Sequence, residues 1–255
     1  MKNTTSWQSS STWYSKEVGL TGHYYHQNVV IPGVLRLLDL KPSSSVLDLA
    51  CGQGVLSRHL KDYGYQGIDL ARSLIDYANH HKISPTHRFT VGDITKTLPI
   101  NKKDFTHATI ILALQNVEEL DKVIANAARH LSPKGTLVLV LNHPCFRIPR
   151  QSSWEIDEGS KLQYRRINRY LSPLKIPLKT NPGLGEGSPL TWSFHLPLSI
   201  YFKELSLAGF AVTALEEWIS DKDSEGKAAK MENLARSEFP LFLAIKACLS
   251  ITKPL

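Results

Sequence analysis

The sequence predicts an α/β fold with a Rossmann-like parallel sheet, and three observations predict it. Residues 46–49 are typical of a buried strand, and they run directly into a glycine turn and a helix-like spacing of apolar residues over 55–60. Short apolar segments then alternate with helical patterns as far as residue 141. Two further strands, at 212–218 and 241–247, close the chain.

The glycine turn after the first strand has the form of a ligand-binding loop. Gly52 and Gly54 allow positive φ and let a ligand approach the backbone without meeting a Cβ atom. The helix start behind them supplies unpaired N–H groups and a partial positive charge. We therefore expect this loop to hold a ligand with a polar, partly anionic end.

Asp48, Asp69 and Asp93 each lie at the end of a predicted strand, at the same edge of the sheet. Asp69 is suited to accept hydrogen bonds from ribose hydroxyls, and Asp93 to meet an adenine amino group. The loop reads Gly-x-Gly-x-x-Ser, so it is a weak dinucleotide signal by itself. An acid beside the loop would repel a pyrophosphate, whereas a sulfonium that carries an amino group would be tolerated.

Hydrophobic periodicity and turn residues predict the other elements. Strands are expected at 65–70, 89–92, 104–114 and 136–141, with a turn at 132–135 leading into the last of these. Helices are expected at 29–40 (with Pro32 in the first turn), 73–81, 121–131, 198–207 and around 228–235.

Several of these segments together resemble class I S-adenosylmethionine-dependent methyltransferases. The segments are D-L-A-C-G-Q-G, G-I-D-L, V-G-D-I, L-A-L-Q-N-V-E-E-L and L-S-P-K-G-T-L-V-L-V-L, within residues 40–142. The later N-H-P-C-F-R-I-P-R, T-W-S-F-H and E-F-P-L-F-L are similar to one bacterial subgroup of unknown substrate. Val55 stands where the family frequently has a third glycine.

The resemblance implies a complete architecture for the chain. It is a Rossmann-like seven-stranded sheet, mostly parallel with the last strand antiparallel, with helices on both faces and a lid insert after the fifth strand. Residues 1–255 are expected to form a single methyltransferase domain, with 1–40 as an N-terminal helical lid segment and 142–197 as a basic, Pro/Gly-containing insert on the substrate side. Residues 1–12 are expected to be loosely attached.

The resemblance also implies which residues bind the cofactor, S-adenosyl-L-methionine. The loop backbone would hold the methionine part, Asp69 the ribose, and Asp93 with Ile94 the adenine. The expected cofactor-binding residues are Tyr14, Tyr25, Asp48, Ala50, Cys51, Gly52, Gly54, Asp69, Leu70, Asp93, Ile94, Leu112 and Ala113.

The insert carries the residues expected on the substrate side. Residues 142–182 hold eight basic side chains against three acidic ones. If residues 142–150 are polyproline-like, Arg147 and Arg150 point the same way and suit a carboxylate or phosphate; the alternative is that they pair with neighbouring acids. The prolines and glycines of residues 173–187 make that stretch a poor candidate for a regular element and predict a mobile cover. The expected substrate-side residues are Gln115, Asn116, His143, Arg147, Arg150, Trp192 and His195.

Three histidines are candidate general bases, because histidine titrates near neutral pH: His143, His26 and His195. The pattern alone does not choose among them. Capping or structural roles are the alternative for each.

Composition narrows the class of protein. The net charge is +7 in 255 residues, and the three cysteines are far apart with no Cys-x-x-Cys pair. We expect a cytoplasmic protein with no metal site, no membrane span and no signal peptide.

These observations favour methyl transfer from S-adenosylmethionine to a small-molecule acceptor, with an anionic acceptor suggested by the arginines. The alternatives are an RNA-directed methyltransferase, a non-catalytic RNA-binding module that uses the basic insert, and an NAD-dependent oxidoreductase.

Overall fold

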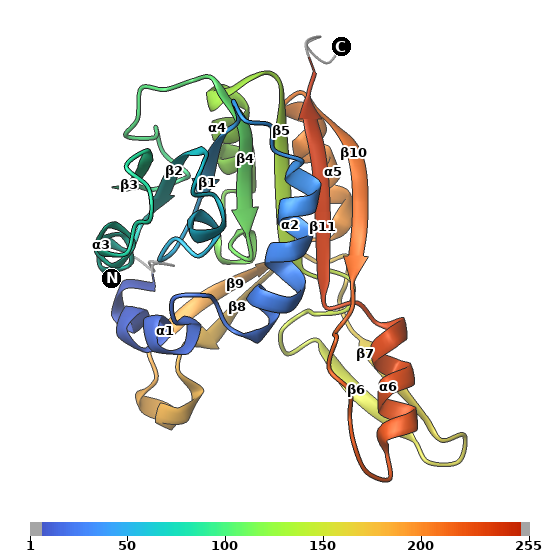
Figure 1. Ribbon diagram of the computed structural model, residues 1–255. Coiled ribbons are helices and arrows are strands. Elements are labelled where there is room, and N and C mark those ends of the chain that lie inside the picture. The colour runs from blue at the N-terminus through green and yellow to red at the C-terminus, as the bar shows by residue number, and fades with distance from the viewer. Residues whose placement is uncertain (1–6, 251–255) are drawn as a thin grey trace.

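A computed structural model describes residues 7–250, and its centre is a seven-stranded sheet (Figure 1). The strand order is β10-β11-β5-β4-β1-β2-β3. The strands are β1 (Ser45–Leu49), β2 (Gly64–Asp69), β3 (His87–Val91), β4 (Phe105–Ile111), β5 (Leu131–Asn142), β10 (Phe210–Trp218) and β11 (Phe242–Leu249). Neighbours among β1–β5 pair in parallel, and β11 is antiparallel to both β5 and β10. The expected mostly parallel sheet with an antiparallel last strand is confirmed.

Helices cover both faces of the sheet because strand side chains alternate between two apolar clusters. Val46 packs in one cluster with α2 (Ile31–Leu38) and α3 (Arg72–His80). Its neighbour Leu47 packs in the other with α4 (Leu120–His130) and α5 (Leu198–Leu207). A strand that is buried on both faces is typical of a parallel sheet.

Two local elements differ from the sequence-based expectation. The segment after the glycine loop is a short 3-10 turn, Leu56–His59, rather than a helix over 55–60. The expected turn at 132–135 lies inside β5: pairing with β4 passes from Leu131 opposite Phe105 to Thr136 opposite His107, so the residues between them bulge from the ladder.

The insert contains two antiparallel hairpins, so the expectation of an irregular cover is wrong. β6 (Ser152–Asp157) pairs with β7 (Leu162–Ile167), and β8 (Leu174–Lys179) pairs with β9 (Leu190–His195). Pro177 lies within β8 opposite Trp192. A two-stranded ribbon tolerates a proline because one edge of each strand is unpaired. A 3-10 segment, Pro182–Gly187, joins β8 to β9.

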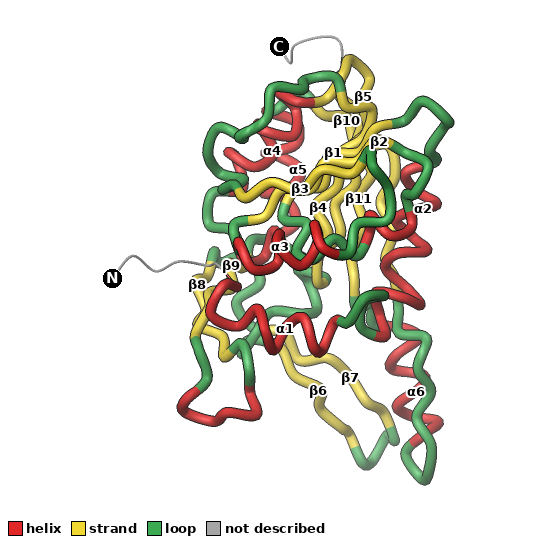
Figure 2. The backbone as a smooth tube through the Cα atoms, turned by 60° about the vertical axis from the view of Figure 1, so that its left-hand side comes forward, coloured by secondary structure: helices red, strands yellow, loops and turns green. Residues whose placement is uncertain are grey.

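The insert and the N-terminal segment lie beyond the carboxyl ends of the parallel strands. Figures 1 and 2 show α1 (Ser11–Val18) crossing below that edge of the sheet beside the β8–β9 hairpin. The β6–β7 hairpin and α6 (Ala229–Glu238) project together on the other side, and α6 packs against β7. Among residues 7–250, none of the helices has the length and apolar character needed to cross a bilayer.

Candidate active site

A cavity of about 1150 Å³ opens at the carboxyl edge of the parallel strands. One side of it, here called the sheet-edge half, is formed by the strand ends and the loops that follow β1 to β4. The other side, here called the cover, is formed by residues 7–30 and by the insert, residues 142–197. Sheet-edge residues include Ala50, Gly52, Asp69, Leu70, Asp93, Ile94, Leu112, Ala113, Gln115 and Asn116; cover residues include Trp7, Tyr14, His23, Tyr25, His26, Asn142, Arg147, Lys175 and Ser193.

The glycine loop forms the floor of the sheet-edge half in a left-handed backbone conformation that glycine adopts without strain. Gly52 and Gly54 have φ of +55° and +77°. A Cβ at Gly54 would lie 2.8 Å from the Phe89 ring, so only glycine fits there. Ala50 and Leu112, which line the cavity beside the loop, also have positive φ, at 60° and 53°. Non-glycine residues in this region are uncommon and cluster at functional sites.

Asp69 ties the second strand to this loop. One carboxylate oxygen accepts a 2.9 Å hydrogen bond from the Gly52 N–H, and the other accepts a 2.8 Å bond from the Ala71 N–H. Burial raises the pKa of the Asp69 carboxyl, and the backbone N–H groups oppose that rise. Each oxygen keeps acceptor capacity, so the carboxylate is fixed in place and still able to bind hydroxyls.

Asp93 and Ile94 follow β3 and also line the cavity. One oxygen of Asp93 accepts hydrogen bonds from the N–H of Thr95 at 2.9 Å and its hydroxyl at 2.7 Å. The Asn126 amide donates to the carbonyl of Ile94 at 2.7 Å and so holds this loop against α4. Both residues are brought together with Asp69 on the sheet-edge half, as expected.

Asp48, in contrast, lies outside the large cavity. It is 3% exposed and accepts hydrogen bonds from the hydroxyls of Tyr65 at 2.5 Å and Thr109 at 2.8 Å. Burial raises the pKa of Asp48 to about 6, against the effect of the two hydroxyls. With Cys51 it lines a cavity of about 40 Å³ beneath the loop. Asp48 therefore supports the loop from below, and Gly54 likewise lines neither cavity.

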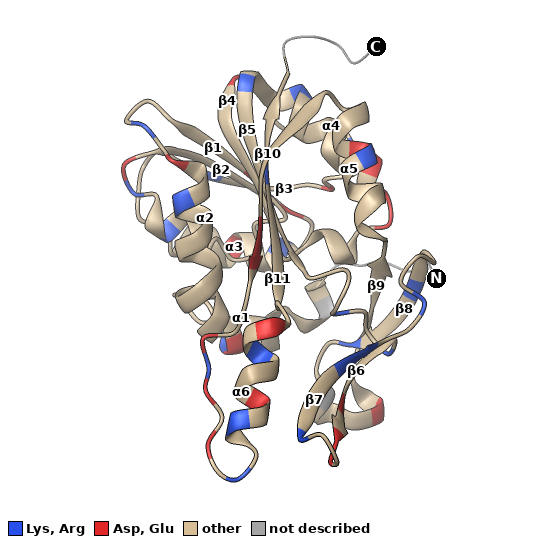
Figure 3. Ribbon diagram, turned by 90° about the vertical axis from the view of Figure 1, so that its right-hand side faces the viewer, with Lys and Arg blue, Asp and Glu red and all other residues tan. Residues whose placement is uncertain are grey.

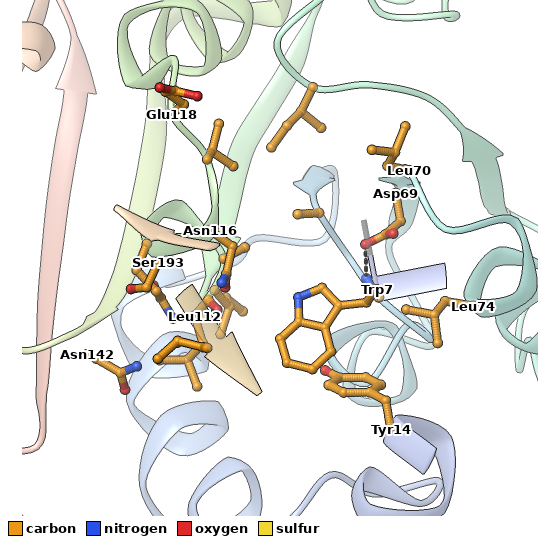
Figure 4. Close-up of a pocket in the computed structure, with 18 of the residues that line it drawn as sticks. Trp7, Tyr14, Asp69, Leu70, Leu74, Leu112, Asn116, Glu118, Asn142 and Ser193 are labelled. Carbon is orange, nitrogen blue, oxygen red and sulfur yellow. Dashed lines mark hydrogen bonds between the residues drawn. The ribbon is translucent and has the colours of Figure 1, made fainter. Parts of the chain in front are cut away.

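Two aromatic rings of the cover enter the cavity beside Asp69 (Figure 4). Tyr14 lies against the loop, with its hydroxyl 3.6 Å from the position of a Cβ on Gly52. Burial and the nearby Asp69 carboxylate raise the pKa of the Tyr14 phenol. The Trp7 indole projects into the middle of the cavity, with its ring centroid 5.5 Å from that of Tyr14.

Trp7 is a cavity residue that sequence reasoning missed, because its polar Ser/Thr-rich surroundings predicted a loose end. The structure places Trp7–Ser10 in a 3-10 turn that leads into α1, so regular structure lies within the segment that was expected to be loose. Residues 1–6 of that expected loose segment lie outside the described residues. His23 was missed as a cavity residue as well.

Of the three candidate bases, only His26 reaches the cavity. Its Nδ1 is buried and has no hydrogen-bond partner among residues 7–250. Burial, with a smaller effect of the neighbouring His23, lowers the pKa of His26 to about 4, so the ring is neutral at physiological pH. The two histidine rings lie 4.0 Å apart between centroids.

His143 and His195 are not placed to act as bases, because neither lines the cavity and both are hydrogen-bonded elsewhere. His143 is 1% exposed; its Nδ1 accepts from the Cys145 N–H at 3.2 Å, and its Nε2 lies 2.7 Å from Glu217. The Nε2 of His195 lies 2.7 Å from the Tyr170 carbonyl, which can only accept. The contact of His143 with Glu217 ties the insert to β10, and the contact of His195 with Tyr170 lies within the insert.

The expected alignment of Arg147 with Arg150 is wrong. The N–H of Arg147 bonds back to the His143 carbonyl at 2.8 Å, so the segment forms turns rather than an extended polyproline-like piece. Arg150 has φ of 60° and is exposed outside the cavity, whereas Arg147 lines it. Turns replace extension here because the two prolines restrict only the residues that precede them.

Gln115 and Asn116 follow β4 and line the cavity as expected. The Gln115 amide nitrogen donates to the Leu112 carbonyl at 2.8 Å, and its Oε1 is buried without a partner among the described residues. The Asn116 amide donates to the Trp192 carbonyl at 3.0 Å. Trp192 thus contributes its backbone to the joint between the halves, while its neighbour Ser193 lines the cavity.

Figure 3 shows Lys and Arg residues on the hairpins of the insert, and two of these residues form ion pairs. Lys175 pairs with Glu118 at 3.1 Å, and Arg166 pairs with Glu155 at 3.4 Å. Trp154 packs on Phe239, with ring centroids 5.5 Å apart, rather than facing solvent.

Part of the sequence is similar to known methyltransferases. Residues 47–139 match a family described as a methyltransferase domain. A demethylmenaquinone methyltransferase of Renibacterium salmoninarum is 35% identical over 106 residues, which make up 41% of this chain and 44% of that protein. The match therefore spans less than half the length of this curated relative.

Solved structures resemble almost the whole chain. An S-adenosylmethionine-dependent methyltransferase from Mesorhizobium loti superposes with a TM-score of 0.67 at 25% identity, covering 87% of this chain and 98% of that one. A glycopeptide N-methyltransferase in complex with S-adenosylhomocysteine superposes with a TM-score of 0.54 at 14% identity, covering 96% and 90% of the two chains.

The fold is that of solved S-adenosylmethionine-dependent methyltransferases. Residues 47–139 match the methyltransferase domain family, and the resemblance stated from the sequence is confirmed. The name of the Mesorhizobium loti protein contains S-adenosylmethionine, the cofactor that was expected from the sequence.

Proposed function

We propose that this protein transfers a methyl group from S-adenosylmethionine to a small-molecule acceptor. One observation carries the proposal. A single cavity joins an acid-bearing, glycine-floored half, which suits the cofactor, to a second half that is roofed by the chain's own N-terminal segment and insert.

The residues of the sheet-edge half fit the cofactor. Gly52 leaves a gap between the loop and Tyr14 that a side chain would fill. Asp69 is held by two backbone N–H groups with acceptor capacity left for ribose hydroxyls. Asp93 and Ile94 line the same half, which supports their proposed contact with the adenine. The carboxylates also suit a ligand that carries a positive sulfonium.

When bound, S-adenosylmethionine supplies an electrophilic methyl group that a nucleophile attacks in line. The main task of the protein is to align the acceptor and exclude water. Tyr25, Phe242 and Leu178 supply apolar surface on the acceptor side. His26 is neutral at physiological pH, and its Nδ1 has no hydrogen-bond partner among the described residues, so it is available to accept a hydrogen bond from the acceptor. Its lowered pKa makes it a weak base, which suits an acceptor that needs little help in losing a proton.

A small acceptor is favoured over RNA because the insert is fastened over the cavity. Its β8–β9 hairpin is joined to the sheet edge by the Asn116–Trp192 hydrogen bond and the Lys175–Glu118 ion pair. Those contacts support a roof over the cavity rather than an open groove. The name of the menaquinone relative makes a quinone-like ring one acceptor to test.

The test is calorimetry with S-adenosylhomocysteine, followed by transfer of a labelled methyl group from S-adenosylmethionine to a pool of small metabolites and, separately, to RNA. We expect cofactor binding and labelling in the small-molecule fraction. Absence of cofactor binding would reject the proposal, and labelling confined to RNA would reassign the acceptor.

A further inference from the structure

The acceptor side of the cavity contains one cation that the protein does not neutralise. Three cationic side chains line the cavity: Lys96, Lys175 and Arg147. Lys175 lies 3.1 Å from Glu118, and Lys96 lies 3.8 Å from Glu119. Arg147 forms no ion pair or hydrogen bond through its side chain with any residue between 7 and 250, and its Nε is buried.

Arg147 is held by an aromatic ring instead of by a carboxylate. Its guanidinium carbon lies 5.7 Å from the centroid of Trp154. Trp154 is itself fixed by packing on Phe239. This contact positions the guanidinium and leaves its charge available.

A second arginine adds to the positive potential. Arg165 lies 5.0 Å from the same Trp154 ring, and its guanidinium donates to the carbonyl of Phe146 and the hydroxyl of Ser152, both uncharged. Burial, and then the proximity of Arg165, lower the pKa of Arg147 to about 10, so it remains charged at neutral pH. The nearby Tyr25 phenol, which is hydrogen-bonded to Ser220, opposes that shift.

Asp69 and Asp93, the cavity acids that form no ion pair within residues 7–250, lie too far away to neutralise Arg147. Asp69 ends β2 and Asp93 follows β3, whereas Arg147 lies in the turns after β5. In the sheet, β4 and β1 separate β5 from β2. Three strand spacings amount to roughly 14 Å, well beyond ion-pair distance.

The wall beside Arg147 is apolar and aromatic. Tyr25 and Phe242 line the cavity with their rings edge to face, 5.8 Å apart between centroids. Pro149 and Leu241 line it as well. A ligand in this half therefore meets apolar surface along its body and one guanidinium at its end.

We infer that Arg147 is a carboxylate-binding residue, and that the methyl acceptor is a small molecule with an aromatic or apolar body and one carboxylate. That the carboxylate ligand is the methyl acceptor rests on the proposed function. A guanidinium fork matches a carboxylate in bidentate geometry, and a single surplus charge suits a monoanion better than a phosphate dianion. Arg147 thereby determines specificity, and it takes no part in the bond changes of methyl transfer.

The test uses the full chain with benzoate, its neutral counterpart benzamide, and phenyl phosphate as probes, by calorimetry with and without S-adenosylhomocysteine. We expect benzoate to bind and benzamide to bind at least ten-fold more weakly. Arg147→Gln is expected to weaken benzoate binding on the order of ten- to a hundred-fold, and Arg147→Lys by less, because a lysine keeps the charge but loses the fork.

Arg150→Gln is the matched control, because Arg150 is exposed outside the cavity, and it is expected to leave benzoate binding unchanged. Unchanged S-adenosylhomocysteine affinity in every variant would show that each remains folded. Equal binding of benzoate and benzamide, no benzoate binding that depends on Arg147, or a preference for phenyl phosphate would each overturn the inference.

The two proposals fail separately. If S-adenosylhomocysteine does not bind, methyl transfer is rejected, while benzoate binding that depends on Arg147 in its absence would leave the carboxylate site standing.

Discussion

The two halves of the cavity are built in different ways. The sheet-edge half is positioned by backbone: strand ends, a glycine loop with positive φ, and carboxylates that accept from N–H groups. The cover is positioned by side-chain contacts between segments far apart in sequence, such as His143 with Glu217 and Trp154 with Phe239. The difference indicates that cofactor binding is a property of the sheet, whereas acceptor choice belongs to segments that can change without disturbing it.

The largest expected contrast is between one glycine from each half. Gly54→Ala puts a Cβ 2.8 Å from Phe89 at a φ of +77°, whereas a Cβ at Gly187 meets no atom within 4 Å. Because both strain and overlap arise at Gly54, we expect a loss of about 2–4 kcal/mol in the free energy of unfolding. Gly187→Ala should change it by less than about 0.5 kcal/mol. Urea denaturation measures both, and equal effects would show that the loop is not the rigid half.

The halves should also respond oppositely to pH. In the cover, the pKa of His26 is lowered to about 4, whereas in the unfolded chain it is about 6.5. As the pH drops below about 6.5, the unfolded chain therefore takes up a proton that the folded chain does not, and the free energy of unfolding falls. Under the sheet edge, the pKa of Asp48 is raised to about 6, so the folded chain keeps its proton and stability falls as pH rises from about 4 to 6.

Substituting either residue should leave the pH dependence of stability that the other one contributes. Relative to wild type, and normalised at pH 7.5, His26→Gln should gain about 2–3 kcal/mol of unfolding free energy at pH 4.5. On the same scale, Asp48→Asn should lose unfolding free energy at pH 4.5, because the stabilising protonated carboxyl of the wild type is absent. The measurement is urea unfolding across this range, and parallel curves for the two variants would contradict the assignment.

Substitutions at Asp69 and at Arg147 are expected to affect different affinities, the first that for the cofactor and the second that for the acceptor. Asp69→Ala should weaken S-adenosylhomocysteine binding on the order of ten- to a hundred-fold, because hydrogen bonds to a charged acceptor are lost. Arg147→Gln should leave that affinity unchanged. Asp104→Ala is the matched control, since Asp104 is exposed just before β4, at the opposite edge of the sheet. Calorimetry that shows the reverse pattern would exchange the roles of the two halves.

The smallest effect is expected where the halves are joined by an exposed ion pair. Lys175 and Glu118 have side chains that are 38% and 61% exposed, so their pairing is screened by solvent. Lys175→Gln should change the free energy of unfolding by less than about 1 kcal/mol. Lys102→Gln, which removes a comparable exposed pair with Asp104, is the control. A thermal-melting loss several-fold larger for Lys175→Gln would show that the joint is a structural requirement.

The same contrast explains how far the sequence could predict the structure. Strands β1 to β5, helices α3 and α4 and the placement of Asp69 and Asp93 follow from local patterns, because hydrophobic period, glycine position and strand-end position are encoded within a few residues. Arg147 and Arg150 were expected side by side, but the turns that separate them depend on bonds such as Arg147 N–H to the His143 carbonyl. The locations of His143 and His195 depend on partners tens of residues away, which no local pattern specifies.

The hairpins of the insert were also missed for a physical reason. Prolines and glycines argue against strands in the middle of a sheet, yet they are compatible with two-stranded ribbons. Trp7 gave no periodic signal in a short polar segment. Its position depends on contact with Tyr14 and on the cavity itself.

The indole of Trp7, set between the glycine loop and the acceptor side, gives the molecule a built-in optical probe. Any ligand that enters beside Asp69 either stacks on this ring or displaces it, and its emission wavelength should shift in either case. Titrations could then be followed without a label. A Trp7→Phe variant, which lacks this indole and keeps the other four, would separate its signal from those of the other tryptophans.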